Sequence, residues 1–142
     1  IEAQRAIHEL NQKRAAENER NKIEDQARLA AGLTPKPVLP LLALGTGINS
    51  GTVTVGLMGS DAHILNYTVF GREVNLASRL ESVSGSGRII IGETTYREIL
   101  RDDPTLAATC VEQEPTKPKG FQKPVRNFEV PWQTSTGKSS EV

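Results

Sequence analysis

The sequence predicts an α+β domain in which helices pack on a mainly antiparallel sheet. Short runs of apolar or alternating residues, bounded by glycine and polar residues, are typical of strands. Between these runs lie stretches in which apolar residues recur every three or four positions, as in amphipathic helices. The predicted order is one helix, three strands, a helix, a strand, a helix and two strands, within 142 residues. That length is sufficient for a single domain with a buried core.

The composition argues against several classes of protein. Seventeen basic and seventeen acidic residues cancel, so we expect neither nucleic acid nor an anionic membrane as a partner. The single cysteine, Cys110, has no disulfide or CxxC partner, which favours a reducing compartment and a cytoplasmic location. No apolar run approaches the roughly 20 residues of a membrane span, so any anchor would lie outside this chain. Because the chain starts at Ile1 inside a helical pattern, we expect it to be part of a longer protein.

Residues 1–31 consist mainly of strong helix formers and predict a helix leading into the domain. Its first half is expected to be amphipathic, and its second half to be a solvated helix or a helix–loop excursion. Residues 32–40 contain Gly32 and three prolines and predict a proline-rich link. The expected apolar stripe of the helix is formed by Ala3, Ile7, Leu10 and Arg14.

The runs 41–48 and 52–58 predict two strands, and the polar residues 49–51 between them predict a hairpin turn. Glycines in these runs do not open a helix, so turns and close strand packing explain them better than a phosphate loop. The remaining predicted elements are a strand over 64–70, a helix from Glu73, a strand over 88–91, a helix over 93–100, strands over 107–112 and 125–130, and a disordered tail over 133–142.

The stretch 66–81 combines a strand end, a turn and a helix that carries Asn75 and Arg79. These two residues are four apart and therefore share one helix face. They are either ordinary surface residues or an anion site, since an amide and a guanidinium together hold a sugar oxygen and a phosphate. Asparagine is a poor helix-interior residue, which favours a functional reason for it. The face expected to meet the core comprises Val74, Ala77 and Leu80–Glu81.

Lys119 and Thr68 are two further candidates. Lys119 lies next to Gly120 in a basic turn between two strands, where a lysine either contacts phosphate or is idle in solvent. Thr68 lies on the strand that precedes the helix, where a hydroxyl is either an ordinary strand residue or a partner for a base edge. If both are functional, Lys119 and Thr68 would line one pocket together with Asn75 and Arg79.

Four segments, 47–60, 66–81, 87–96 and 119–130, resemble the catalytic domain of the class III adenylyl/guanylyl cyclases. The likeness runs in order over about 41–131, and its V-N-x-A-S-R core, here residues 74–79, is specific. It implies that 41–132 is the C-terminal part of a ferredoxin-like cyclase fold whose first strands are missing. The unusually long link over 16–40 is then a surface insertion.

The resemblance implies roles for individual residues. Asn75 would position the ribose, and Arg79 would stabilise the transition state of cyclisation. Thr68 would select the purine, with threonine indicating adenine, while the backbone of Val69 touches the base. Lys119 would contact the terminal phosphates. The implied reaction converts ATP to 3′,5′-cyclic AMP and pyrophosphate in signal transduction.

The resemblance also implies what this chain lacks. The family's two metal-binding aspartates and its base-selecting lysine lie upstream of the first helix, so we expect the ligands of Mg²⁺ or Mn²⁺ outside this chain and assign none within it. Family members work as head-to-tail dimers, which implies a homodimer or another cyclase domain as partner and an inactive isolated fragment. The alternatives are a guanylate cyclase, a degenerate cyclase-homology domain that binds nucleotide or dimerises as a regulatory module, and an unrelated α+β binding domain.

Overall fold

The computed structural model describes residues 1–59, 66–119 and 121–133. The chain divides into two compact units, of which one is Gly45–Trp132 and the other begins with Ile1–Leu44. The predicted tail from residue 134 onward and the first two residues of the predicted strand over 64–70 lie outside the described residues.

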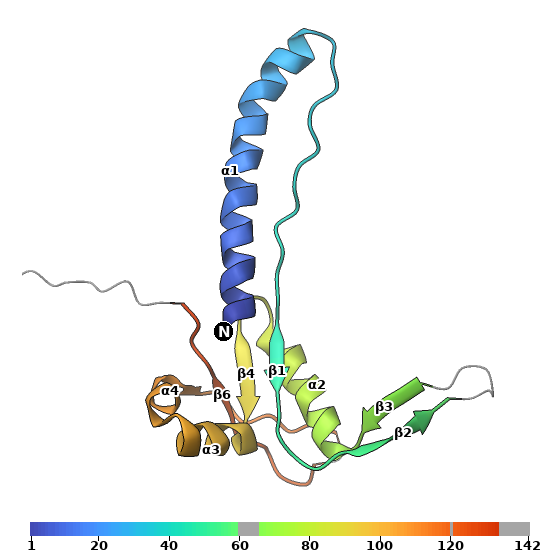
Figure 1. Cartoon of the computed structure of the whole chain (residues 1–142), viewed down its shortest axis with the longest axis vertical. Coiled ribbons are helices and arrows are strands. Elements are labelled where there is room, and N and C mark those ends of the chain that lie inside the picture. Colours follow the sequence, from blue (N-terminus) through green and yellow to red (C-terminus); the bar gives the residue numbers. More distant parts are fainter. Residues whose placement is uncertain (60–65, 120, 134–142) are drawn as a thin grey trace, which may run out of the picture. The chain divides into compact units, whose positions relative to one another are not determined.

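The unit Gly45–Trp132 contains two sheets and three helices (Figure 1). Its strands are β1 (Thr46–Ile48), β2 (Thr54–Met58), β3 (Asn66–Phe70), β4 (Ile89–Gly92), β5 (Val111–Glu112) and β6 (Asn127–Glu129). Its helices are α2 (Arg72–Ser84), α3 (Glu93–Asp102) and α4 (Pro104–Thr109). One sheet has the order β1-β4-β6-β5, and β2 pairs with β3 in the other. Of the pairings between the described strands, β1–β4 is parallel and the others are antiparallel, so the predicted α+β class with a mainly antiparallel sheet is confirmed.

The predicted hairpin between the runs 41–48 and 52–58 is wrong. β1 pairs with β4 and β2 pairs with β3, and residues 41–44 form no strand at all. The link between β1 and β2 does not form a tight turn, and its side chains form hydrogen bonds with α2 and α3. Asn49 Nδ2 donates to Glu73 Oε2 at 2.8 Å, and Ser50 Oγ donates to Glu98 Oε2 at 2.7 Å. These non-local contacts hold the two strands in different sheets.

β4 is the centre of the larger sheet, and its residues are buried on both faces. Successive side chains of a strand point to opposite faces. Ile90 accordingly packs with Leu76, Leu80 and Phe121, whereas Ile89 and Ile91 pack with Phe128, Val130 and the helices α3 and α4. α2 thus covers one face of the sheet and α3–α4 the other, as Figure 1 shows.

The buried face of α2 differs from the predicted one. Leu76, Leu80 and Ser84 are buried, while Glu81 is exposed. Leu80, which the prediction included, is fully buried. The core-facing line is therefore rotated by about one residue from Val74 and Ala77, which are only half-buried. Asn75 and Arg79 lie on the exposed side.

The predicted strands near the C-terminus are shorter than expected. Residues 104–109 form α4 and not a strand, because Pro104 occupies its first turn and the Asp103 side chain accepts a hydrogen bond from the Leu106 amide at 3.0 Å. Proline at the first helical position and an aspartate cap both favour a helix start. Strand structure then covers only Val111–Glu112 and Asn127–Glu129, with an isolated bridge at Val125.

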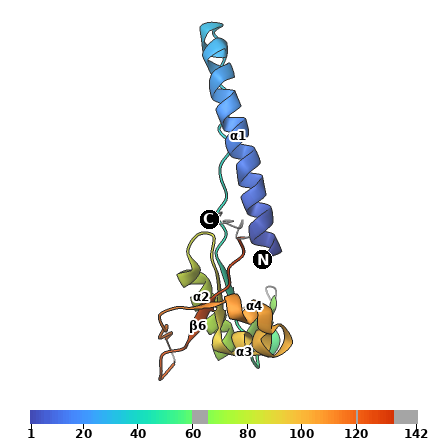
Figure 2. The ribbon, with the colours of Figure 1, turned by 90° about the vertical axis from the view of Figure 1, so that its left-hand side faces the viewer.

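In the other unit, α1 (Glu2–Ala30) is one continuous helix, and the segment 33–44 runs back alongside it without forming a strand (Figures 1 and 2). The predicted apolar stripe is wrong, because Ala3 and Leu10 are exposed. Except for the half-buried Ile7, the stripe that faces the segment is polar, and the polar side chains that bond the segment are Gln4, Asn11, Arg14, Asn18, Asp25 and Arg28. None of the helices in the described ranges combines the length and the apolar composition that a bilayer crossing requires.

Side chains of α1 hold the segment 33–44 by its backbone. Asn18 donates to Leu39 O at 2.9 Å and accepts from Leu39 N at 2.8 Å, and Asn11 bonds Leu42 in the same two-way manner at 2.7 and 2.8 Å. Asp25 accepts from the Lys36 amide at 2.8 Å.

The spacing of these contacts explains their regularity. The three side chains on α1 are seven residues apart, which is about 10.5 Å along a helix. Their partners are three residues apart, which is about 9.3 Å in the polyproline II backbone that prolines favour. Because these two repeat lengths are nearly equal, each of the three α1 side chains lies beside its own partner residue in the extended segment.

Replacing Asn18 by alanine is expected to remove both hydrogen bonds to Leu39. The free energy needed to open the segment around Leu39 is expected to fall by about 2 kcal/mol. Hydrogen–deuterium exchange of the Leu39 amide measures this loss of protection. Glu17→Ala, at the neighbouring exposed position, is the matched control and leaves the exchange rate unchanged. Equal rates in both variants would contradict the role of the asparagine.

Candidate functional site

The turn from β3 into α2 sets the position of Asn75. Gly71 has a φ of 139°, a conformation that glycine adopts readily and other residues rarely do. Its carbonyl accepts from the Asn75 amide at 3.1 Å, which places Asn75 one turn inside the helix. Arg79 follows one turn later on the same exposed face.

This face of α2 forms one wall of a hollow of about 580 Å³. Lys119 and its neighbours form the other wall. The lining residues are Asn75, Ser78, Arg79, Ser82, Lys117, Pro118 and Lys119. The structure therefore brings together three of the five predicted site residues, namely Asn75, Arg79 and Lys119.

Three lining residues were missed by the sequence predictions. Ser78 and Ser82 follow Asn75 at helical spacing, so the periodicity of α2 was a sufficient signal for them. Lys117 lies two positions before Lys119 on the same basic link, but no local pattern of the sequence indicates that its side chain lines the hollow.

The loop that carries the lysines is held at several points. Thr116 and Val125 exchange two backbone hydrogen bonds, of 3.0 and 2.7 Å. Pro118 is buried, and its carbonyl accepts from the Phe121 amide at 3.1 Å. Phe121 itself is buried in the core beneath α2. The lysines on either side of Pro118 are thus exposed side chains on an anchored backbone.

The hollow is strongly cationic. Arg79, Lys117 and Lys119 line it, and no carboxylate of the described residues does. Within the ranges that the structure describes, none of these three cations forms an ion pair or a side-chain hydrogen bond. Uncompensated charges of one sign in a concave site attract a multivalent anion.

The same residues do not fit a divalent metal ion. Mg²⁺ and Mn²⁺ prefer carboxylate and other oxygen ligands, whereas this hollow offers cations, an amide and two hydroxyls. In the described part of the chain, no group of three or more His, Cys, Asp or Glu side chains could hold a metal. We therefore assign no step to a metal on these residues.

Thr68 and Val69 lie elsewhere, on β3 of the two-stranded sheet. Their Cα partners on β2 are Gly56 and Val55. Thr68 is half-buried and Val69 is 48% exposed. Neither residue lines the hollow, so the structure does not join the predicted base-binding residues to the phosphate-binding ones.

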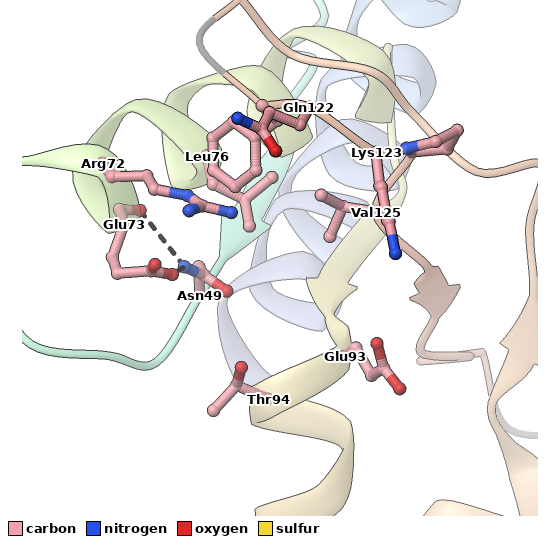
Figure 3. A pocket seen from close by; sticks show the side chains of 11 residues that line it. Asn49, Arg72, Glu73, Leu76, Glu93, Thr94, Gln122, Lys123 and Val125 are labelled. Atoms are coloured by element: carbon pink, nitrogen blue, oxygen red, sulfur yellow. Dashed lines mark hydrogen bonds between the residues drawn. The ribbon is translucent and has the colours of Figure 1, made fainter.

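A second hollow of about 460 Å³ lies where α2 and α3 begin (Figure 3). The Arg72 guanidinium stacks over the Phe121 ring at 4.1 Å, and Asn49 bonds Glu73. Figure 3 also shows Glu93 and Lys123 at this hollow. Because its acidic and basic side chains balance, this hollow lacks the one-sided charge of the first.

Cys110 provides no nucleophile. It is half-buried, and burial raises the pKa of its thiol, so the reactive thiolate is disfavoured. Its Sγ donates to the Leu106 carbonyl at 3.5 Å. Cysteine-based covalent chemistry is therefore not supported.

Comparison with known proteins identifies the family. Residues 9–129 match the profile of the adenylate and guanylate cyclase catalytic domain. The chain belongs to this family. The class III cyclase resemblance drawn from the V-N-x-A-S-R core is thereby confirmed, and the chemistry of the family is that of nucleotidyl cyclases, which are lyases.

Individual relatives of this cyclase-family chain include enzymes of both specificities. An adenylate cyclase of Anabaena cylindrica is 30% identical over 112 residues, 78% of this chain and 21% of that protein. The soluble guanylate cyclase subunit alpha-2 of Rattus norvegicus is 44% identical over 57 residues, 40% of this chain and 8% of that protein. The chain thus spans 21% and 8% of the length of these two relatives.

Two solved structures share the fold. The adenylyl cyclase CyaB of P. aeruginosa has a TM-score of 0.55 and 36% identity, covering 85% of this chain and 56% of that one. The guanylyl cyclase Cya2 has a TM-score of 0.53 and 33% identity, covering 91% of this chain and 52% of that one.

Proposed function

We propose that this chain is the part of an adenylate cyclase catalytic domain that binds the ribose and phosphates of ATP. The observation that carries the proposal is the hollow in which Asn75, Arg79 and Lys119 meet without a carboxylate. An amide, a guanidinium and an ammonium are donors suited to a sugar oxygen and to phosphate oxygens.

In the proposed reaction, the 3′-hydroxyl oxygen of ATP bonds to the α-phosphorus as the bond to the oxygen bridging the α- and β-phosphates breaks. The hydroxyl proton passes to solvent water, and pyrophosphate leaves with the bridging oxygen. Asn75 holds the ribose so that its 3′-oxygen faces the α-phosphate. Arg79 stabilises the negative charge that develops on the phosphoryl oxygens and the leaving group. Lys119 binds the terminal phosphates.

The chain supplies only part of such a site. Among the residues that the structure describes, none that lines its hollow is a carboxylate, and the proposal places the family's divalent-metal ligands and base-selecting lysine on residues outside this chain. A second cyclase domain, identical or different, completes the site. The partner and the full activity belong to the whole protein in this proposal.

Thr68 is expected to favour ATP over GTP. In the complete cyclase domain, kcat/KM measured with each nucleotide tests this preference. The Thr68→Ala substitution removes one hydrogen bond to the base. It is expected to lower the ratio of kcat/KM for ATP to kcat/KM for GTP by roughly tenfold. Thr54→Ala, at an exposed position of the same two-stranded sheet, leaves the ratio unchanged.

The outcomes of this assay separate the alternatives. A higher kcat/KM for GTP in the unsubstituted domain overturns the assignment of ATP and identifies a guanylate cyclase. Formation of no cyclic nucleotide from either substrate, with nucleotide binding intact, identifies a regulatory homology domain.

A further inference from the structure

We propose that Lys117 is a second phosphate-binding residue, and that Arg79, Lys117 and Lys119 bind a polyphosphate chain without help from base or sugar. The inference rests on the proposed function for the source of that polyphosphate, the tail of a nucleoside triphosphate. It adds a binding residue and a ligand class, inorganic polyphosphate, that can be tested without turnover.

The backbone around Pro118 places the two lysines together. Pro118 lies between the two lysines, and its carbonyl accepts a hydrogen bond from the Phe121 amide at 3.1 Å, so the chain turns just after Lys117. Pro118 is buried, whereas Lys117 and Lys119 are exposed. Both lysines also line the hollow opposite Arg79. The burial of the proline therefore directs both ammonium groups toward the exposed face of α2.

Lys117 is attached to the better anchored end of this segment. Its neighbour Thr116 is fixed by two backbone hydrogen bonds to Val125, and proline on the other side has a restricted φ. An ammonium group on a fixed backbone loses less freedom on binding than one on an unsupported loop. This preorganisation favours a specific contact over diffuse attraction.

The positive charge of the hollow is opposite in sign to that of a polyphosphate and is spread over three side chains. A triphosphate carries several negative charges along a short chain, and three cations line this hollow. None of them is neutralised by a carboxylate among the described residues. Ser78 adds a hydroxyl donor to the same wall. Recognition by charge along the chain requires neither a base nor a sugar.

In this arrangement, the two lysines have a different role from Arg79. Lys117 and Lys119 contact phosphates that are present in substrate, transition state and pyrophosphate product alike. Such uniform binding lowers KM and leaves kcat little changed. Loss of Lys117 is therefore expected to raise KM for the nucleotide and to weaken inhibition by pyrophosphate.

The direct test is binding of inorganic tripolyphosphate to the 142-residue chain by isothermal titration calorimetry at low salt. Lys117→Met and Lys119→Met are each expected to raise Kd roughly tenfold, the loss of one charge-assisted hydrogen bond. Lys117→Arg, which keeps the charge, stays within about threefold of the unsubstituted chain. Lys123→Met is the matched control, because Lys123 is on the same loop but outside this hollow, and its Kd is unchanged.

Two results would overturn the inference. One is the absence of tripolyphosphate binding by a chain whose circular dichroism shows it folded. The other is an equal loss of affinity in Lys117→Met and Lys123→Met, which would indicate diffuse charge attraction only. Since cyclase turnover is not the readout, the two proposals fail separately: binding by the chain that depends on Lys117, together with no cyclic nucleotide formed by the complete cyclase domain, would support this inference and refute the proposed function.

Discussion

Replacement of Arg79 by alanine is expected to lower kcat of the complete cyclase domain by about 10²-fold or more. The guanidinium lines the carboxylate-free hollow and has no acidic partner among the described residues. Its charge is therefore available for the negative charge that develops as the 3′-oxygen bonds to the α-phosphorus. A contact that strengthens in the transition state affects kcat more than KM.

The measurement is initial-rate formation of cyclic AMP over a range of ATP concentrations. Arg101→Ala is the matched control, because Arg101 is an exposed helix residue that pairs with the adjacent Asp102 at 2.7 Å. Its kcat and KM are expected to equal those of the unsubstituted domain. An unchanged kcat in Arg79→Ala would refute the role of Arg79, and equal losses in both variants would indicate a general effect on the fold.

Replacement of Gly47 by alanine is expected to lower the free energy of unfolding by about 3 kcal/mol. A Cβ at this position of β1 would lie 2.6 Å from Ala77 O and 2.7 Å from Glu81 Cα, and closer still to Glu81 N. These are main-chain atoms of α2, so no side-chain rotation relieves the overlap. Either β1 or α2 must move, and α2 carries Asn75 and Arg79.

Urea unfolding of the chain, followed by circular dichroism, measures this change. Gly56→Ala is the matched control, because a Cβ there would meet only Phe70 Cε1, at an ordinary 3.8 Å. Its free energy of unfolding is expected to stay within about 1 kcal/mol of the original value. Equal midpoints for the two variants would contradict the close packing of β1 on the backbone of α2.

The part of the candidate site that lies on α2 was predictable from the sequence. Asn75 and Arg79 share a face because they are four residues apart, and that relation depends only on the helix. In the lysine half, the position of Lys119 in a basic turn made it a candidate phosphate contact, and the family resemblance favoured that role over an idle lysine in solvent. Lys117 was not identified, since its direction depends on the burial of Pro118 beneath the loop. The roles assigned to these residues, to Thr68 and to Val69 stay predictions until the substitutions are measured.

By itself, the sequence determined the α+β class, the apolar strand predicted over 88–91, the helix that carries Asn75 and Arg79, and the cyclase family. Local periodicity and short motifs encode all of these. Tertiary structure decided that β1 pairs with β4, that the inward stripe of α1 is polar, and that two lysines face Arg79 across one hollow. The reason is physical: a strand's partner and a side chain's surroundings depend on contacts between residues far apart in the chain, which local patterns do not specify.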